Sequence, residues 1–257
     1  MTTAKIRVRG LRKSFGGKRV LEGVDLEIMP STSMVVIGGS GSGKSVLVKC
    51  ILGLIEPEAG EIEIDGQDIL ELSRADQEEV RGRMGMLFQN GALFDSLQVW
   101  ENIGFGLIAR GKSTRSQARE RATELLTMVG LGAGVRDLYP SELSGGMQKR
   151  VALARAIAAE PDILFFDEPT TGLDPIMGAV IDDLIMELVR GTGSTTVAIT
   201  HDMASARRIG DSAAMLYQGQ IVWTGPATKL MNSGNPLVDQ FTHGRLEGPI
   251  EVEVSRE

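Results

Sequence analysis

The stretch GGSGSGKS, from Gly38 to Ser45, constrains the fold of this chain more than any other feature of its sequence. It fits the pattern G-x-x-x-x-G-K-[ST], which forms a phosphate-binding loop when a strand precedes it and a helix follows. The apolar run MVVI comes just before it, and apolar residues at helical spacing come just after. Glycines let successive backbone N–H groups point at one anion, and a helix N-terminus adds positive charge there. The stretch therefore predicts an α/β fold that binds a nucleoside triphosphate with magnesium.

The loop alone leaves several kinds of protein open. A glycine-rich loop can simply turn a strand into a helix, and the same pattern occurs in kinases, GTPases, motors and transport ATPases. With 257 residues the chain is long enough for one large α/β domain. Its 34 acidic and 27 basic side chains give a net charge of −7, which disfavours non-specific binding to nucleic acid.

Two sequence features bear on location. No run approaches eighteen consecutive apolar residues, so no membrane span is expected. The first ten residues, MTTAKIRVRG, lack the apolar core of a signal peptide, which predicts that the chain stays in the cytosol. The single cysteine, Cys50, has apolar neighbours and is predicted to be a buried structural thiol.

The N-terminal part predicts a sheet beside the glycine loop. Ile6 to Val8 and Val24 to Ile28 are expected strands, separated by the turn-prone FGGKR that begins at Phe15. Phe15 either stacks on a purine base or belongs to the core, and the sequence does not decide between them. Further on, EAGEIEIDGQDI predicts a hairpin that turns at Asp65-Gly66.

The middle of the chain predicts one more strand and then a long helical block. A polar helix capped by Ser73 precedes the apolar run MGMLFQ, which ends at Gln89. Gln89 either faces a ligand at the end of that strand or only begins a loop. From Asn90 to about Glu160 the pattern is almost continuously helical, which is too long for an ordinary crossover and predicts an inserted subdomain. Within this block LSGGMQ places Ser144 at a helix start, where it is either an anion site or a plain N-cap.

The last third carries polar residues at the ends of two predicted strands. ILFFDE predicts a buried strand that delivers Asp167 and Glu168 to the carboxyl edge of the sheet, where the first can hold magnesium and the second can polarise water. Asp174 before a proline predicts a helix cap. TTVAIT is another strand and ends at His201, which is expected to face the same edge. SAAMLYQGQIVWTG predicts a hairpin, and the tail from Pro236 to Glu257 is expected to be too polar to form a core.

The order and spacing of these signals decide the family. GGSGSGKS at 38, Gln89, LSGGMQ at 143, ILFFDE at 163, GLD at 172 and His201 together resemble the ATP-binding-cassette ATPases, over about residues 5 to 230. The LSGGMQ element is specific to that family among proteins with this loop. The resemblance implies a P-loop NTPase (RecA-like) α/β core with an N-terminal antiparallel β subdomain. It also implies an ATPase domain at 1–235 with a helical subdomain inserted at about 90–160, and a tail at 236–257 that contacts a dimer partner.

The resemblance also implies a role for each motif. ATP and Mg²⁺ are the expected cofactors, with Lys44 on the phosphates, Glu168 activating water, His201 near the γ-phosphate, and Ser45, Gln89 and Asp167 on the metal. Two copies would form a head-to-tail dimer in which Ser144, Gly145, Gly146 and Gln148 of one copy cover the ATP of the other. Phe15 would stack on adenine and Asp174 would lie at the dimer contact. The implied loop contacts are Gly38, Gly39, Ser40, Gly41, Ser42, Gly43, Lys44, Ser45 and Val46.

Three further segments are similar to the Mla-type ATPases of bacterial intermembrane phospholipid transport, namely FQNGALFDSLQVWENIGFGL, DEPTTGLDPI and QFTHGRLEGPI. That similarity implies multispanning permease subunits, one helix of which enters the cleft beside Gln89. It also implies a lipid-binding, membrane-anchored subunit, a small STAS-type regulatory subunit and a position on the cytoplasmic face of the inner membrane. An importer for a polar solute such as an amino acid is the alternative. A cassette protein acting on DNA or ribosomes is disfavoured, because such proteins carry two cassettes or long coiled coils.

Overall fold

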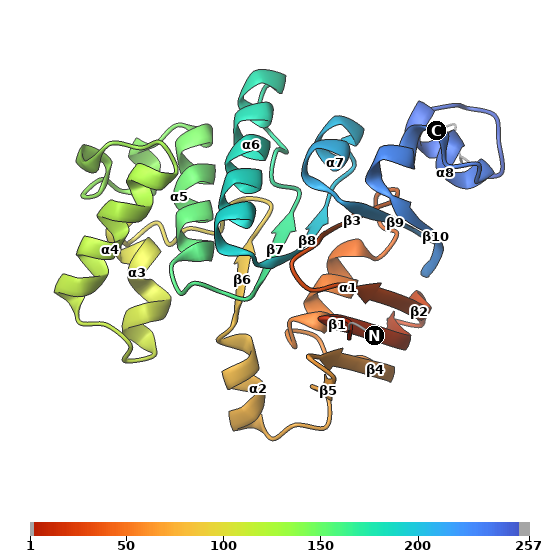
Figure 1. Cartoon of the computed structure of the whole chain (residues 1–257), viewed down its shortest axis with the longest axis horizontal. Coiled ribbons are helices and arrows are strands. Elements are labelled where there is room, and N and C mark those ends of the chain that lie inside the picture. Colours follow the sequence, from red (N-terminus) through yellow and green to blue (C-terminus); the bar gives the residue numbers. More distant parts are fainter. Residues whose placement is uncertain (1–2, 252–257) are drawn as a thin grey trace. The chain divides into compact units, whose positions relative to one another are not determined.

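The computed structural model describes residues 3–251 and divides into two compact units. The first unit comprises Met1–Leu72 and Ala198–Glu257, and the second comprises Ser73–Val197. Figure 1 labels their helices and strands, and each unit is described by itself below.

The first unit begins with a four-stranded antiparallel sheet in the order β2-β1-β4-β5. Strand β1 pairs with β2 through Ile6 and Ile28, and with β4 through Ile6 and Ile64, so these three isoleucines share one buried layer. The observed strands β1 and β2 are longer than predicted. Gly10, at φ +56°, interrupts the register without ending the pairing, so the polar residues after it continue the strand. The strands are β1 Ile6–Phe15, β2 Lys18–Ile28, β4 Ala59–Ile64 and β5 Gln67–Asp68.

A second set of strands in the first unit supports the glycine loop. The fully buried β3 (Ser33–Ile37) runs parallel to β9 (Ser212–Tyr217), which forms a hairpin with β10 (Gln220–Pro226). This hairpin turns at Gln218 and Gly219, both with positive φ, as the sequence predicts. The helices of this unit are α1 Lys44–Ile51, α7 Met203–Ile209, the 3₁₀ helix η3 Ala227–Asn232 and α8 Pro236–His243.

The second unit contains two parallel strands and most of the helices. Strand β6 (Met84–Leu87) pairs with β7 (Ile163–Asp167), and β8 (Thr195–Ile199) leads back to the first unit. Ser73 caps α2 by accepting a hydrogen bond from the Asp76 N–H, as predicted. The helices are α2 Arg74–Arg81, α3 Val99–Ala109, α4 Arg115–Met128, η1 Ala133–Val135, η2 Pro140–Glu142, α5 Gly145–Ile157 and α6 Pro175–Thr192.

The prediction of nearly continuous helix from Asn90 is wrong at its start. The segment between β6 and α3 is a loop, in which Gly91 and Ala92 have φ of +71° and +49°. Such left-handed angles cannot continue a helix. The buried Asn102 side chain holds the second half of this loop, because it accepts from the Phe94 N–H and donates to the Phe94 and Leu97 carbonyls.

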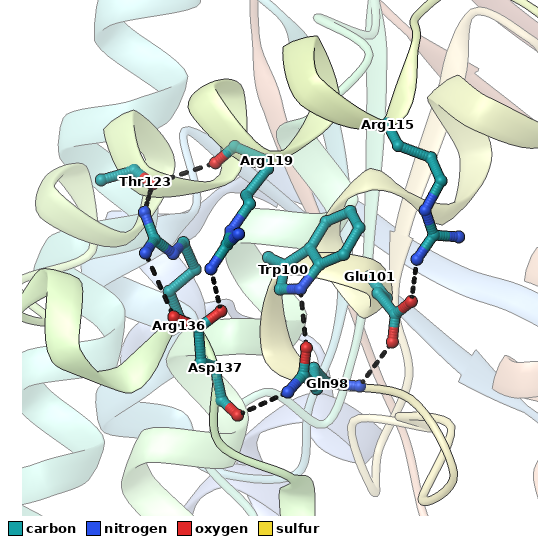
Figure 2. Close-up of polar contacts among 8 residues, drawn as sticks. All are labelled: Gln98, Trp100, Glu101, Arg115, Arg119, Thr123, Arg136 and Asp137. Carbon is teal, nitrogen blue, oxygen red and sulfur yellow. Dashed lines mark hydrogen bonds and ion pairs between the residues drawn. The ribbon is translucent and has the colours of Figure 1, made fainter.

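A polar cluster around Trp100 fastens α3 to α4 and to the segment after η1 (Figure 2). The Trp100 ring is buried beneath the guanidinium groups of Arg115 and Arg119, at 5.0 and 5.8 Å from the ring centroid, and its Nε1–H donates to Gln98. Arg119 also pairs with Asp137, whose carboxyl pKa is lowered by hydrogen bonds from Arg136 and Arg119. This cluster fixes the start of α3, and with it the end of the loop that follows β6.

These elements make the mixed α/β fold that the sequence predicts, with an antiparallel sheet near the N-terminus and a helical block after β6. The predicted domain limits, 1–235 and 236–257 with an insertion at about 90–160, stay predictions. One expectation for the tail is wrong, since α8 within it buries Val238 and Gln240. No helix of residues 3–251 is long and apolar enough to cross a bilayer.

Candidate nucleotide site

The glycine loop connects β3 to α1 in the conformation that its sequence predicts. Gly38 has φ +153°, and a Cβ there would lie 2.3 Å from the Leu216 carbonyl oxygen, so a larger residue does not fit. The buried Lys44 folds back over the loop, and its Nζ donates to the Gly38 and Gly39 carbonyls at 2.7 and 3.0 Å. This arrangement holds the ammonium beside the loop in which a phosphate would bind.

Two further features of the loop suit a phosphate. The α1 N-cap is Gly43, which has no side chain to satisfy the first N–H groups of the helix, and helix-start N–H groups bind anions. The Ser42 Oγ is buried and makes no hydrogen bond within the described part of the chain. Because buried hydroxyls normally have partners, this one is ready to donate to a ligand. Ser45 and Val46, on the first turn of α1, are half-buried.

Phe15 ends β1 and is 48% exposed, so the expectation that it is an ordinary core residue is wrong. The Lys13 Nζ lies 5.3 Å from its ring centroid. Its predicted stacking on a purine stays a prediction. Lys18 and Arg19, which follow Phe15 closely in the sequence, border a cleft of about 490 Å³. The loop residues Gly41 and Ser42 also line this cleft.

The two predicted carboxylates stand at the end of β7. This strand is buried at every residue, and Asp167 at its end is 8% exposed. Glu168 follows with φ +49°, a conformation that glutamate adopts rarely and that proteins tend to keep at functional sites. The Thr171 hydroxyl donates to Glu168 Oε2 at 3.2 Å, which orients the carboxylate. The hydroxyl of Ser45 and the carboxylate of Asp167 are oxygen donors of the kind that magnesium prefers.

Ser144 is the N-cap of α5, and its Oγ accepts from the Met147 N–H at 3.3 Å. The plain N-cap interpretation is therefore confirmed, while an additional anion contact stays a prediction. Ser144 and Gly145 are exposed, and Gly146 is half-buried beside Met177. The Gln148 amide turns away from the helix start and donates to the Pro140 and Leu143 carbonyls.

Gln89 has an exposed side chain just after β6, and its main chain contacts α5. Its carbonyl accepts a hydrogen bond from Lys149 Nζ, and the next carbonyls, of Gly91 and Ala92, accept from Arg155. Burial lowers the pKa of Lys149 and of Arg155, whereas the charges of Asp167 and Glu168 raise that of Lys149. Sequence reasoning missed both cations, although both lie on the helix that Ser144 caps.

The remaining predicted residues lie at helix starts. Asp174 caps α6, with its carboxylate accepting from the Ile176 and Met177 N–H groups at 3.0 Å. This confirms the predicted cap, and Pro175 occupies the first helical position. His201 is exposed after β8, one residue before Asp202, which caps α7.

An apolar groove of about 450 Å³ lies in the second unit between β6, the loop after it, α3 and α5. Phe94 and Phe105 stand at it with 44% and 45% of their surface exposed, and their ring centroids are 4.7 Å apart. Arg110 and Arg155 add positive charge to its lining. Exposed aromatic pairs of this kind mark sites where another apolar segment binds.

The sequence was compared with models of protein families and with known proteins. Residues 21–171 match the family model described as ABC transporter. A ribonucleotide transport ATP-binding protein of Mycobacterium leprae, mkl, is 43% identical over 245 residues, which is 95% of this chain and 70% of that protein. The intermembrane phospholipid transport system ATP-binding protein MlaF of Escherichia coli K12 is 39% identical over 245 residues, covering 95% of this chain and 91% of MlaF.

Among solved structures, the fold is similar to a dimeric, post-hydrolysis state of the ATP-binding cassette MJ0796 bound to ADP and Pi. The TM-score is 0.79 at 33% sequence identity, and the match covers 86% of this chain and 98% of that one. The predicted fold class is thereby confirmed.

Proposed function

Since the chain belongs to the ABC transporter family, we propose that it is the ATP-hydrolysing subunit of a machine that moves phospholipid between bacterial membranes. The observation that carries this proposal is the similarity to MlaF, which extends over 91% of that protein. The tail QFTHGRLEGPI, which lies outside the residues 21–171 that match the family model, is among the segments that are similar to the Mla-type ATPases.

The residues of the candidate site supply the parts of a hydrolytic reaction. Lys44, Ser42 and the N–H groups at the start of α1 hold the phosphates, with Gly38 to Val46 as their cradle, and Phe15 receives the adenine. Ser45, Asp167 and Gln89 would hold Mg²⁺, which when bound would neutralise charge on the phosphate oxygens. Glu168, oriented by Thr171, accepts a proton from the attacking water, and His201 contacts the γ-phosphate.

Two copies of the chain complete each site. The exposed start of α5, with Ser144, Gly145 and Gly146, covers ATP bound to the other copy. Gln148 supports this lid from the next turn of the helix, and Asp174 lies at the contact between copies. Triphosphate and magnesium hold the copies together, and loss of phosphate after hydrolysis removes part of that attraction. The resulting opening and closing performs the mechanical work.

The apolar groove is where we place the membrane partner. Its aromatic pair and its two arginines suit a short amphipathic helix that presents apolar residues and an acid. One side of the groove is formed by Phe88, Ala92 and Phe94, so a partner in the groove contacts the loop that contains Gln89. We assign the groove to a multispanning permease. Further partners are a membrane-anchored lipid-binding subunit and a small STAS-type subunit. The chain itself then lies on the cytoplasmic face of the inner membrane.

Reconstitution tests the cargo. The chain is co-purified with its multispanning partner, inserted into vesicles and supplied with Mg-ATP and a fluorescent phospholipid. We expect ATP-dependent movement of the lipid and a severalfold stimulation of turnover by phospholipid. Lys44→Ala should abolish both, because the buried triphosphate loses its cation. Stimulation by a ribonucleotide or an amino acid with a solute-binding protein, and not by phospholipid, would instead establish a polar cargo.

A further inference from the structure

Two cations of α5 hold the loop that begins at Gln89. Lys149 Nζ donates to the Gln89 carbonyl, and Arg155 donates to the Gly91 and Ala92 carbonyls at 2.6 and 2.7 Å. The loop also packs closely on the helix, since a Cβ at Gly91 would lie 3.4 Å from the Ala152 Cβ. Three carbonyls of this loop, those of Gln89, Gly91 and Ala92, are therefore turned toward α5 and held there by charge-assisted hydrogen bonds.

Lys149 is the more unusual of the two cations. It is 7% exposed, and an ammonium taken out of water costs several kcal/mol unless other groups compensate. The compensating groups are the Gln89 carbonyl at the end of β6 and the negative charges of Asp167 and Glu168 at the end of β7. Lys149 on α5 thus links two features of the candidate site, the loop that contains Gln89 and the carboxylates at the end of β7.

We propose that Lys149 is a positioning residue for ATP hydrolysis, which fixes the Gln89 main chain against α5 and supplies the positive charge that Asp167 and Glu168 face. It lies five residues after Ser144, within the first two turns of the helix whose N-terminus is the lid. When the start of α5 contacts the nucleotide of the other copy and the helix moves, the Gln89 main chain moves with it, because the hydrogen bond from Lys149 connects the two. The inference rests on the roles proposed for Gln89 and Glu168, and not on phospholipid as the cargo.

Three substitutions distinguish the effect of the Lys149 charge from the effect of the size of its side chain. Lys149→Met keeps the length and removes the charge and the donor. Because removal of one member of a buried charge cluster destabilises a fold, urea unfolding checks that Lys149→Met is native, and Lys149→Gln carries the test if it is not. Lys149→Gln keeps a donor without the charge, and Lys149→Arg keeps both. The matched control is Arg150→Met, since the neighbouring Arg150 donates to the Gly130 carbonyl and does not reach the loop.

Steady-state ATP turnover with saturating magnesium is the measurement. We expect Lys149→Met and Lys149→Gln to lower kcat at least about ten-fold, as misplaced catalytic groups do, with KM for ATP changed less than about two-fold. Lys149→Arg should recover at least about half of the wild-type kcat, and Arg150→Met should leave kcat and KM within about two-fold.

A kcat of Lys149→Met within two-fold of wild type would overturn the inference, and so would an equal loss in Arg150→Met or a failure of Lys149→Arg to recover activity. Glu168→Gln is measured in the same series. If it hydrolyses ATP at the wild-type rate, the proposed catalytic role of Glu168 fails instead, and the two failures are thus told apart.

Discussion

Cys50 shows how the fold changes the chemistry of one side chain. The thiol lies on α1, five residues after Ser45 at the end of the glycine loop, and is fully buried. Desolvation raises its pKa from 9.0 to about 11, against a smaller opposite effect of the Lys13 charge. The predicted buried, structural thiol is confirmed, and the fold keeps it protonated at any physiological pH.

This pKa predicts both a reactivity and a pH dependence. At pH 8 a shift from 9.0 to about 11 leaves about a hundred-fold less thiolate, so labelling with a disulfide reagent should be at least that much slower in the native protein than in urea. Because the folded pKa is the higher one, the contribution to stability is present below pH 9.0 and is lost as the pH rises toward 11. Wild type should therefore lose more stability over this interval than Cys50→Ala, measured by urea unfolding. Rapid labelling of the native thiol, or parallel pH curves for the two proteins, would contradict the prediction.

Single residues also show which parts of the site the sequence could predict. Lys44, Asp167 and Glu168 lie in sequence patterns that specify both residue type and local structure. These patterns therefore predict the position of Lys44 at the glycine loop and of the two carboxylates at the end of a strand. Lys149 and Arg155 have no such pattern. Their importance comes from carbonyls of a loop some sixty residues earlier, with separations of 60 for Lys149 and Gln89 and 64 for Arg155 and Gly91. Only the packing of α5 on that loop brings them together.

At the scale of elements, local sequence signals predict the hairpin turns and the helix caps. The path of the loop after β6 depends instead on its packing against α3 and α5. Asp65-Gly66 and Gln218-Gly219 turn where predicted, because positive φ at both residues is a local property. The prediction of nearly continuous helix from Asn90 fails over the loop after β6, whereas the helix expected within LQVWENIGFGLIAR is present as α3. The loop backbone is held instead by side chains of α3 and α5, which are contacts that no local pattern encodes.

The segment after α8 depends on one buried side chain. Gln240 is 4% exposed, and its amide donates to the Arg245 and Ile250 carbonyls and accepts from the Ile250 N–H at 2.7 Å. We expect Gln240→Ala to lower the opening free energy of residues 245–250 by about 2 kcal/mol, which accelerates hydrogen exchange there roughly thirty-fold. Exchange in α1 and β3 should not change, and the exposed Gln67→Ala serves as the control. Unchanged exchange at 245–250 would show that other contacts hold this segment.

At the scale of the whole molecule, the proposed mechanism requires that the lid of one copy lies on the glycine loop of the other. Ser40 and Ser144 are both exposed, and the only native cysteine is buried, so two single-cysteine proteins can be made in a Cys50→Ala background. One carries Ser40→Cys and the other Ser144→Cys, each with Glu168→Gln to slow hydrolysis. When the two are mixed and a short bifunctional thiol reagent is added, a 40–144 link necessarily joins two copies.

We expect this link to form at least about ten-fold more with Mg-ATP than without nucleotide, because the triphosphate carries the attraction between the copies. The link is measured by mass spectrometry of the cross-linked proteolytic peptides, which distinguishes 40–144 links from 40–40 and 144–144 links. Adding Lys44→Ala to the Ser40→Cys chain should abolish the increase, since that copy no longer holds ATP against the lid. A 40–144 link that forms equally with and without nucleotide, or that never forms while 144–144 links do, would place the start of α5 away from the partner's loop. The two helix starts that are predicted to bind anions, those of α1 and α5, would then serve separate purposes, and the hydrolytic mechanism would have to be built within one copy.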